Sequence, residues 1–80
     1  MPNKVTIYST PTCVYCNMTK EFFKKNSVVY EDHNVAEDDD AREEMINKSQ
    51  QLGVPVIDIN GKIIIGYDEA ALSKLLGLKK

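Results

Sequence analysis

Short hydrophobic runs along the chain alternate between the two-residue period of strands and the wider spacing of helices. Residues 4–8 alternate and are β-branched, which predicts a first strand that ends at Pro11. Residues 13–25 carry apolar side chains at helical spacing and predict a helix. Residues 28–30 predict a second strand that continues towards Val35. We expect the lysines of the first helix to form a solvated face, although one of them, Lys20, lies one turn beyond Cys16; the others are Lys24 and Lys25.

Two further helices are indicated by their ends as well as by their apolar faces. The acidic residues 37–40 stand where a helix dipole favours negative charge, and they open a helix with Met45 and Ile46 on one face. Asp68 can cap a final helix, which Gly77 ends. We expect three leucines of this helix to face the core: Leu72, Leu75 and Leu76. We expect Leu78 to contact the C-terminal end of the helix.

Between these helices lies a predicted β-hairpin. Residues 56–59 and 62–65 are strand-like runs joined by Asn60-Gly61, a strong hairpin signal because both residues of the tight turn need positive φ. The predicted order is therefore β-α-β-α-β-β-α. A right-handed crossover makes the first two strands parallel, and the hairpin makes the last two antiparallel. We predict an α/β fold with a four-stranded mixed sheet flanked by three helices.

Length and charge narrow the class of protein further. Eighty residues make one small domain, residues 1–80, and nothing in them demands a dimer. A net charge of −2 argues against a nucleic-acid partner and against polybasic attachment to a membrane. The longest aliphatic run, residues 63–65, is too short to span a bilayer, and no secretory apolar segment precedes the first strand. We therefore expect a complete, monomeric, cytoplasmic protein.

The only two cysteines stand at the start of the first helix, in the sequence Cys13-Val14-Tyr15-Cys16. A disulfide between them closes a very short loop and stabilises a fold little, so chemical reactivity is the better explanation for the pair. Free N–H groups at a helix N-terminus favour negative charge. We therefore predict that Cys13 is the exposed thiolate nucleophile and that Cys16, one turn further on, resolves the mixed disulfide.

Two further segments are candidates for binding a peptide-like ligand. Val54-Pro55 stands just before the hairpin, where a proline fits at the first position of a strand and base rates favour a trans bond. We expect this segment to lie near the cysteine loop, with the Val54 backbone free to pair with an extended peptide. Tyr67-Asp68 begins the last helix, whose free amides suit a carboxylate, although Asp68 can equally be no more than a cap.

A carrier of soft metal ions is the alternative to a protein that performs disulfide exchange. Thiolates suit Cu(I), and small copper-binding domains place a Cys-x-x-Cys between a first strand and a helix. Such carriers follow the order β-α-β-β-α-β and tend to have methionine where this chain has Pro11. A zinc site lacks ligands, since two thiols and the single histidine, His33, do not complete four. We therefore expect no metal in this protein.

Several segments together resemble the glutaredoxins, over essentially the whole chain. The matching residues are Val5-Thr6-Ile7-Tyr8, Thr12-Cys13-Val14-Tyr15-Cys16, Val54-Pro55 and Gly66-Tyr67-Asp68. The resemblance implies a thioredoxin-like fold and thiol–disulfide exchange with glutathione as co-substrate and no tightly bound cofactor. It also implies that Pro55 is cis, and that the partners are glutathione and proteins that carry disulfides.

The same resemblance implies roles for individual residues. Cys13 is similar to the thiol that bonds the glutathione sulfur, Tyr15 would flank the tripeptide, and Val54 would pair with its cysteine backbone. The γ-glutamyl end would be held by residues 67–68. The remaining contacts implied with glutathione are those of Thr10 and Pro55.

Three departures from the glutaredoxin pattern bear on the electron donor. Val14 replaces the usual proline, Thr10 a common lysine, and Ile65-Gly66 a pair of glycines. These changes should alter the redox potential, weaken the attraction for a glutathione carboxylate and narrow the glutathione groove. They also resemble the glutaredoxin-like redoxins that thioredoxin reductase recharges, some of which reduce ribonucleotide reductase. Tyr15 and residues 67–68 favour glutathione, and thioredoxin reductase stays as the alternative donor.

Overall fold

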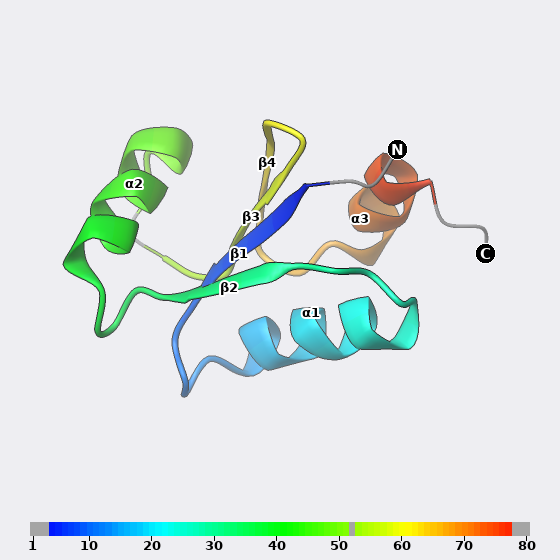
Figure 1. The fold of residues 1–80 in the computed structure, drawn as a ribbon, viewed down its shortest axis with the longest axis horizontal. Coiled ribbons are helices and arrows are strands. Elements are labelled where there is room, and N and C mark those ends of the chain that lie inside the picture. Colours follow the sequence, from blue (N-terminus) through cyan, green and yellow to red (C-terminus); the bar gives the residue numbers. More distant parts are fainter. Residues whose placement is uncertain (1–3, 52, 78–80) are drawn as a thin grey trace.

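The structure, a computed structural model, describes residues 4–51 and 53–77 (Figure 1). Within them the elements follow the predicted order β-α-β-α-β-β-α. None of the helices in these ranges has the length and apolar character that crossing a membrane requires. The elements are β1 (Val5–Ser9), α1 (Val14–Lys25), β2 (Glu31–Asn34), α2 (Asp39–Ser49), β3 (Val56–Ile59), β4 (Lys62–Ile65) and α3 (Glu69–Leu76).

The strands form one mixed sheet in the order β2-β1-β3-β4. The central strand β1 runs parallel to β2 and antiparallel to β3, and β4 pairs antiparallel with β3. Tyr8 of β1 pairs with His33 on one side and with Val56 on the other. The hairpin turn has the predicted positive φ at both residues, 54° at Asn60 and 92° at Gly61. The predicted sheet is therefore confirmed, and the cysteine loop follows a central strand.

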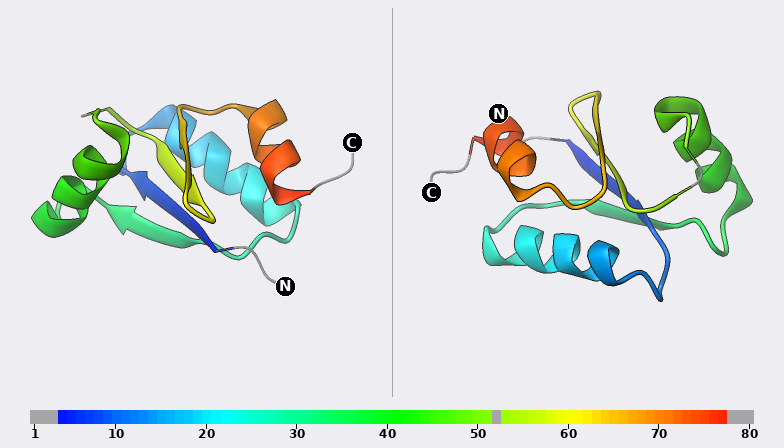
Figure 2. Two further views of the ribbon diagram at one scale, coloured as in Figure 1. Left: turned by 90° about the horizontal axis from the view of Figure 1, so that it is seen from above. Right: turned by 180° about the vertical axis from the view of Figure 1, so that it is seen from behind.

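The helices cover both faces of the sheet, with α1 and α3 on one face and α2 on the other (Figure 2). Successive side chains of a strand point to opposite faces, so Ile7 joins the core under α1 and α3 while Tyr8 joins the core under α2. Phe22, Phe23 and Leu72 fill the larger core. The smaller core consists of Tyr8, Val35, Ala41, Met45 and Val56.

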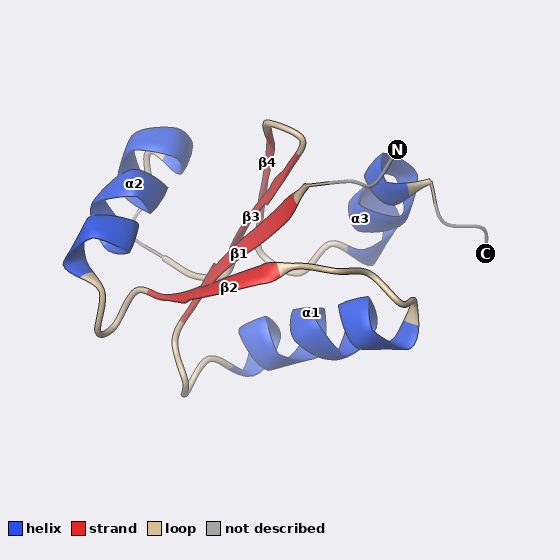
Figure 3. Ribbon diagram, in the orientation of Figure 1, coloured by secondary structure: helices blue, strands red, loops and turns tan. Residues whose placement is uncertain are grey.

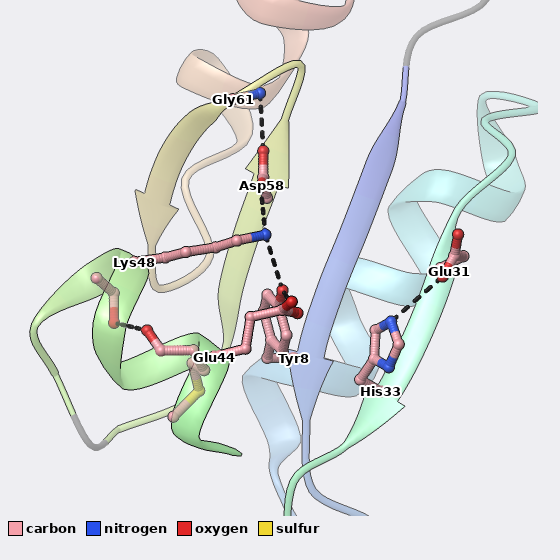
Figure 4. Close-up of polar contacts among 9 residues, drawn as sticks. Tyr8, Glu31, His33, Glu44, Lys48, Asp58 and Gly61 are labelled. Atoms are coloured by element: carbon pink, nitrogen blue, oxygen red, sulfur yellow. Dashed lines mark hydrogen bonds and ion pairs between the residues drawn. The ribbon is translucent and has the colours of Figure 1, made fainter. Parts of the chain in front are cut away.

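A polar network ties α2 to the sheet beside the smaller core (Figure 4). Tyr8 Oη donates to Glu44 Oε1 at 2.5 Å and accepts from Lys48 Nζ at 3.0 Å. Lys48 Nζ also donates to Asp58 Oδ2 at 2.9 Å. Hydrogen bonds to Asp58 and Tyr8 raise the pKa of Lys48, so this lysine stays charged at neutral pH. Charged contacts and apolar contacts therefore both hold α2 against the sheet.

The helix ends follow the predicted capping residues. Asp38 Oδ1 accepts the N–H of Ala41 at 3.1 Å and caps α2. Asp68 caps α3 in the same way, and Gly77 ends it in the left-handed conformation with φ 71°. Each cap satisfies a backbone group that the helix end leaves without a partner. Leu78, expected to contact the end of the last helix, lies outside the described residues.

The second strand is present and runs towards Val35 as predicted, but it begins at Glu31, so its predicted start over residues 28–30 is wrong. Val28 N–H donates to Phe23 O at 2.8 Å, and Ser27 adopts a left-handed φ of 56°. Val29 is 86% exposed. The end of α1 leaves carbonyl groups that need donors, and this segment supplies one of them before the chain enters the sheet. The β-branched pattern of the segment was therefore misleading.

Candidate active site

Cys13 is the N-cap of α1, in the loop that leads from β1 into the helix (Figure 3). Its N–H donates to the carbonyl of the half-buried Thr10 at 3.3 Å, and its side chain is partly exposed. Its Sγ accepts the backbone N–H of Cys16 at 3.1 Å. A negative charge on this sulfur meets both that donor and the positive end of the helix dipole. The expected placement of Cys13 is confirmed, and its ready ionisation stays a prediction.

Cys16 is fully buried one turn further along α1. Burial, followed by hydrogen bonding to Cys13, raises the pKa of its thiol to about 12, although the Thr10 backbone and the Lys20 charge act in the opposite direction. Both cysteines are free thiols. At neutral pH, Cys16 therefore keeps its proton, while Cys13 is the sulfur that solvent reaches. The two thiols are suited to different steps of disulfide exchange.

The segment before β3 forms a second wall of the cysteine site. The Val54–Pro55 peptide bond is cis, as the resemblance implies and against the base rate for X-Pro bonds. Pro55 is fully buried and Val54 half-buried. The distance from Cys13 Sγ to Val54 O is 3.9 Å, within the range of a weak S–H···O contact. Two segments that are 41 residues apart in sequence are therefore in contact at the nucleophile.

The start of α3 is attached to the same cis-proline segment. Gly66 N–H donates to Pro55 O at 2.9 Å, and Gly66 adopts a φ of 82° that favours glycine. Asp68 is exposed, and its Oδ1 accepts the N–H of Ala71 at 3.1 Å. The capping role of Asp68 is thus confirmed, and a contact from Asp68 to a ligand stays a prediction.

Large apolar side chains lie exposed or half-buried around the two segments. Val14 is 66% exposed and Tyr15 61% exposed, in the first turn of α1. Tyr67 is half-buried, with its ring edge-on to that of Phe22 at a centroid distance of 6.2 Å. A groove of about 250 Å³ between α1 and the start of α3 is lined by Met18, Glu21, Phe22, Lys25, Tyr67 and Glu69. Of the predicted site residues, Tyr67 lines this groove, while the two cysteines and Val54 lie outside its lining.

Lys20 is placed wrongly by the sequence, which puts it on a solvated face with the other lysines of α1. Its side chain is only 20% exposed, and its Nζ lies 2.7 Å from Asp32 Oδ2 in β2. Asp32 Oδ1 in turn accepts from Ser9 Oγ at 2.7 Å. Lys20 follows Cys16 by four residues, which on a helix means the same face. This spacing is the signal that identifies Lys20 as a neighbour of the site.

His33 lies away from the cysteines, on the face of the sheet that α2 covers. Its ring stacks on Tyr8 with centroids 5.5 Å apart, and its Nε2 lies 3.3 Å from Glu31 Oε1. In the part of the chain that the structure describes, three or more potential ligand side chains of His, Cys, Asp or Glu do not gather anywhere. The order of elements, with α2 between β2 and β3, also differs from that of the copper-binding carriers.

Sequence comparisons match most of this chain to one family. The family model described as Glutaredoxin matches residues 5–64. A glutaredoxin-like 8.6 kDa protein in the rubredoxin operon of Clostridium pasteurianum is 50% identical over 72 residues, 90% of this chain and 96% of that protein. Glutaredoxin 3 of Escherichia coli strain K12 is 34% identical over 65 residues, 81% of this chain and 78% of that protein.

Solved structures agree with the sequence comparisons. The crystal structure of the glutaredoxin from Archaeoglobus fulgidus is similar to this fold with a TM-score of 0.83 at 28% identity, over 90% of this chain and 84% of that one. The shared arrangement is the thioredoxin-like fold, with a four-stranded mixed sheet and three helices. With its Cys-x-x-Cys at a helix start beside a cis-proline, the chain belongs to the glutaredoxin family.

Proposed function

We propose that the protein is a thiol–disulfide oxidoreductase that reduces protein disulfides or glutathione mixed disulfides. One observation carries the proposal: Cys13 Sγ is partly exposed and bound by a helix N–H, while the thiol of Cys16 is fully buried with its pKa raised to about 12. The first sulfur is suited to attack a substrate and the second to release it. Membership of the glutaredoxin family supports thiol redox chemistry in general.

The reaction begins when the Cys13 thiolate attacks one sulfur of the substrate disulfide. The substrate S–S bond breaks, one half leaves as a thiolate that takes up a proton, and the other half stays bonded to Cys13. For a glutathione mixed disulfide, a second glutathione thiolate attacks the bound glutathione, which frees Cys13 and forms glutathione disulfide. For a protein disulfide, Cys16 displaces the bound half and a Cys13–Cys16 disulfide forms. The substrate gains two electrons in either route.

Three features support glutathione as the second thiol. The Val54 backbone lies against Cys13, with 3.9 Å from Val54 O to the sulfur, so an extended peptide bonded there can pair with it. Tyr15 is 61% exposed and can cover such a peptide. The start of α3, at Tyr67 and Asp68, offers helix amides to a carboxylate. The remaining proposed contacts come from Thr10 and Pro55.

A second candidate is a redoxin that thioredoxin reductase recharges, with ribonucleotide reductase as one acceptor. The cysteine loop favours it, because residues 10–16 contain no lysine or arginine to attract the carboxylates of glutathione. Val14 is 66% exposed and Ile65 46% exposed, which suits the surface of a protein partner. This candidate shares the chemistry of Cys13 and Cys16 and differs only in the electron donor.

The discriminating experiment reduces the oxidised protein in two parallel assays. One assay supplies NADPH, glutathione reductase and glutathione, and the other supplies NADPH and thioredoxin reductase. Turnover in the first assay alone supports glutathione as donor, and turnover in the second alone assigns the redoxin. A Cys13→Ser variant serves as the control in both. If the wild-type protein stays oxidised in both assays, the proposed function is wrong.

We also propose that the protein works in the cytoplasm as a monomer. A dithiol that is to donate electrons needs a reducing compartment, and the cytosol provides one. Cell fractionation and size-exclusion chromatography test the two parts separately. Recovery in an oxidising compartment, or elution as a dimer, contradicts them.

A further inference from the structure

Lys20 is held against the inner side of α1 by residues of two strands. Its Nζ lies 2.7 Å from Asp32 Oδ2 in β2, and only 20% of its side chain is exposed. Asp32 Oδ1 accepts from Ser9 Oγ at 2.7 Å, and Ser9, in β1, is 1% exposed. The ammonium group is therefore fixed under the helix, where a lysine with a long flexible side chain would otherwise extend into water.

Cys16 lies on the same face of α1 as Lys20, four residues before it. Cys16 is fully buried, and burial is the main reason why the pKa of its thiol is raised to about 12. The charge of Lys20 lowers that pKa and so opposes burial. Lys20 is the cation that lowers the pKa of Cys16. Besides burial, Cys13 at the N-cap raises this pKa.

The dithiol route requires Cys16 to act as a thiolate although it is buried. Once Cys13 is bonded to a substrate, it carries no charge, and the remaining obstacle to ionising Cys16 is desolvation. A fixed cation near a buried thiol reduces this cost, because the low polarity of the surroundings strengthens the attraction. The pKa of Cys16 is lowered by the backbone of Thr10 and, next, by the charge of Lys20.

We propose that Lys20 stabilises the Cys16 thiolate while the mixed disulfide is resolved, and that Asp32 and Ser9 are positioning residues that hold its ammonium group in place. This inference rests on the proposed function. In the step itself, Cys16 loses its proton and attacks Cys13 Sγ, the bond from Cys13 to the substrate sulfur breaks, and the Cys13–Cys16 bond forms. The substrate sulfur departs as a thiolate with the electron pair of the broken S–S bond, and it then takes up the proton.

Asp32 is suited to hold Lys20 rather than to accept the proton of Cys16. Burial alone would raise the pKa of its carboxyl, but the hydrogen bonds from Lys20 and Ser9 hold that pKa below its usual value. A carboxylate with a low pKa is a weak base towards a thiol. The proton therefore passes to the departing thiolate, which is the stronger base.

The test is a stopped-flow reaction of the reduced protein with one equivalent of 5,5′-dithiobis(2-nitrobenzoate). Attack by Cys13 releases one thionitrobenzoate, and resolution by Cys16 releases the second, so the two steps appear as separate phases. In Lys20→Met we expect the second phase to slow about tenfold, the effect of a one-unit rise in pKa, with the first phase unchanged within about twofold. The pH profile of the second phase should shift upwards. Lys20→Arg keeps the charge and should restore the rate.

Matched controls separate this role from a structural one. Lys24→Met removes an exposed lysine from the same helix and should leave both phases unchanged. Cys16→Ser should abolish the second phase and confirm its assignment. If Lys20→Met loses its fold, Lys20→Gln and Lys20→Arg are compared instead. The inference is overturned if the rate of the second phase is unchanged when the charge of Lys20 is removed. It is also overturned if Lys20→Arg does not restore that rate. A wild-type protein without the first phase overturns the proposed function instead.

Discussion

The backbone N–H of Cys16 donates to Cys13 Sγ over 3.1 Å, so the two residues of the motif are connected before any disulfide forms. The same residue that supplies this donor buries its own thiol completely. Cys16 therefore stabilises negative charge on its partner through its backbone, while its side chain stays neutral. A substitution of its side chain leaves the backbone donor in place, which makes the two roles separable by mutation.

Replacing the two cysteines should have unequal effects. Cys13→Ser removes the attacking sulfur and should reduce activity to background with every disulfide substrate. Cys16→Ser keeps the N–H donor and should retain deglutathionylation while losing reduction of protein disulfides. Both variants are measured with a glutathione mixed disulfide and with a protein disulfide. Equal loss of both activities in the two variants would contradict glutathione as the second thiol.

Alkylation should distinguish the thiols by burial. Iodoacetamide reacts with thiolates, and the pKa of Cys16 is raised to about 12 by burial. At about pH 7–8 we expect modification at Cys13 alone, with Cys16 modified only after denaturation. Mass spectrometry of peptides before and after adding guanidinium locates the label. Comparable labelling of the two residues in the folded protein would rule out the buried, protonated state of Cys16.

Lys48→Met should weaken the attachment of α2 to the sheet. The variant keeps the apolar stem but removes the ion pair to Asp58 and the hydrogen bond to Tyr8. We expect a loss of about 1–2 kcal/mol in the free energy of unfolding, measured by urea titration. Lys62→Met, on an exposed position of β4, is the matched control and should change little.

The effect of Lys48→Met should also depend on pH. Burial by itself would raise the pKa of Asp58, but the hydrogen bond from Lys48 holds that pKa below its usual value. This contribution is present above the carboxyl pKa of the unfolded chain, about 4, and is lost as the pH falls through the lower folded value. The stability difference between wild type and Lys48→Met should therefore shrink in acid. If the stability difference stays the same in acid, it comes from packing and not from the ion pair.

Gly61→Ala should destabilise the hairpin through backbone conformation alone. Gly61 has a φ of 92°, and a Cβ there would meet nothing within 4 Å, so strain is the only cost. We expect about 1–2 kcal/mol less stability in the urea titration. Gly53→Ala is the control, because its φ lies outside the left-handed region and its Cβ also meets nothing within 4 Å. Similar losses in both variants would contradict the argument from φ.

Features that depend on near neighbours could be predicted from the amino-acid order. The Asn60-Gly61 turn, the cap at Asp68 and the position of Cys13 before a helix are all found as expected. Each follows from preferences that act over a few residues, such as positive φ, a capping oxygen or a free N–H group. The order of elements followed from these signals and from the periodicity of apolar residues.

Features that depend on distant residues were decided by the tertiary structure. The pairing of Lys20 with Asp32, the contact of Val54 O with Cys13 Sγ and the strand order each join segments that are not neighbours in sequence. Val28 is a different case, because its N–H bonds to the nearby Phe23 O at the end of α1, and its β-branched side chain gave no sign of this local contact. Local periodicity states which face of an element is apolar, but the partner on that face is set by packing of the whole chain.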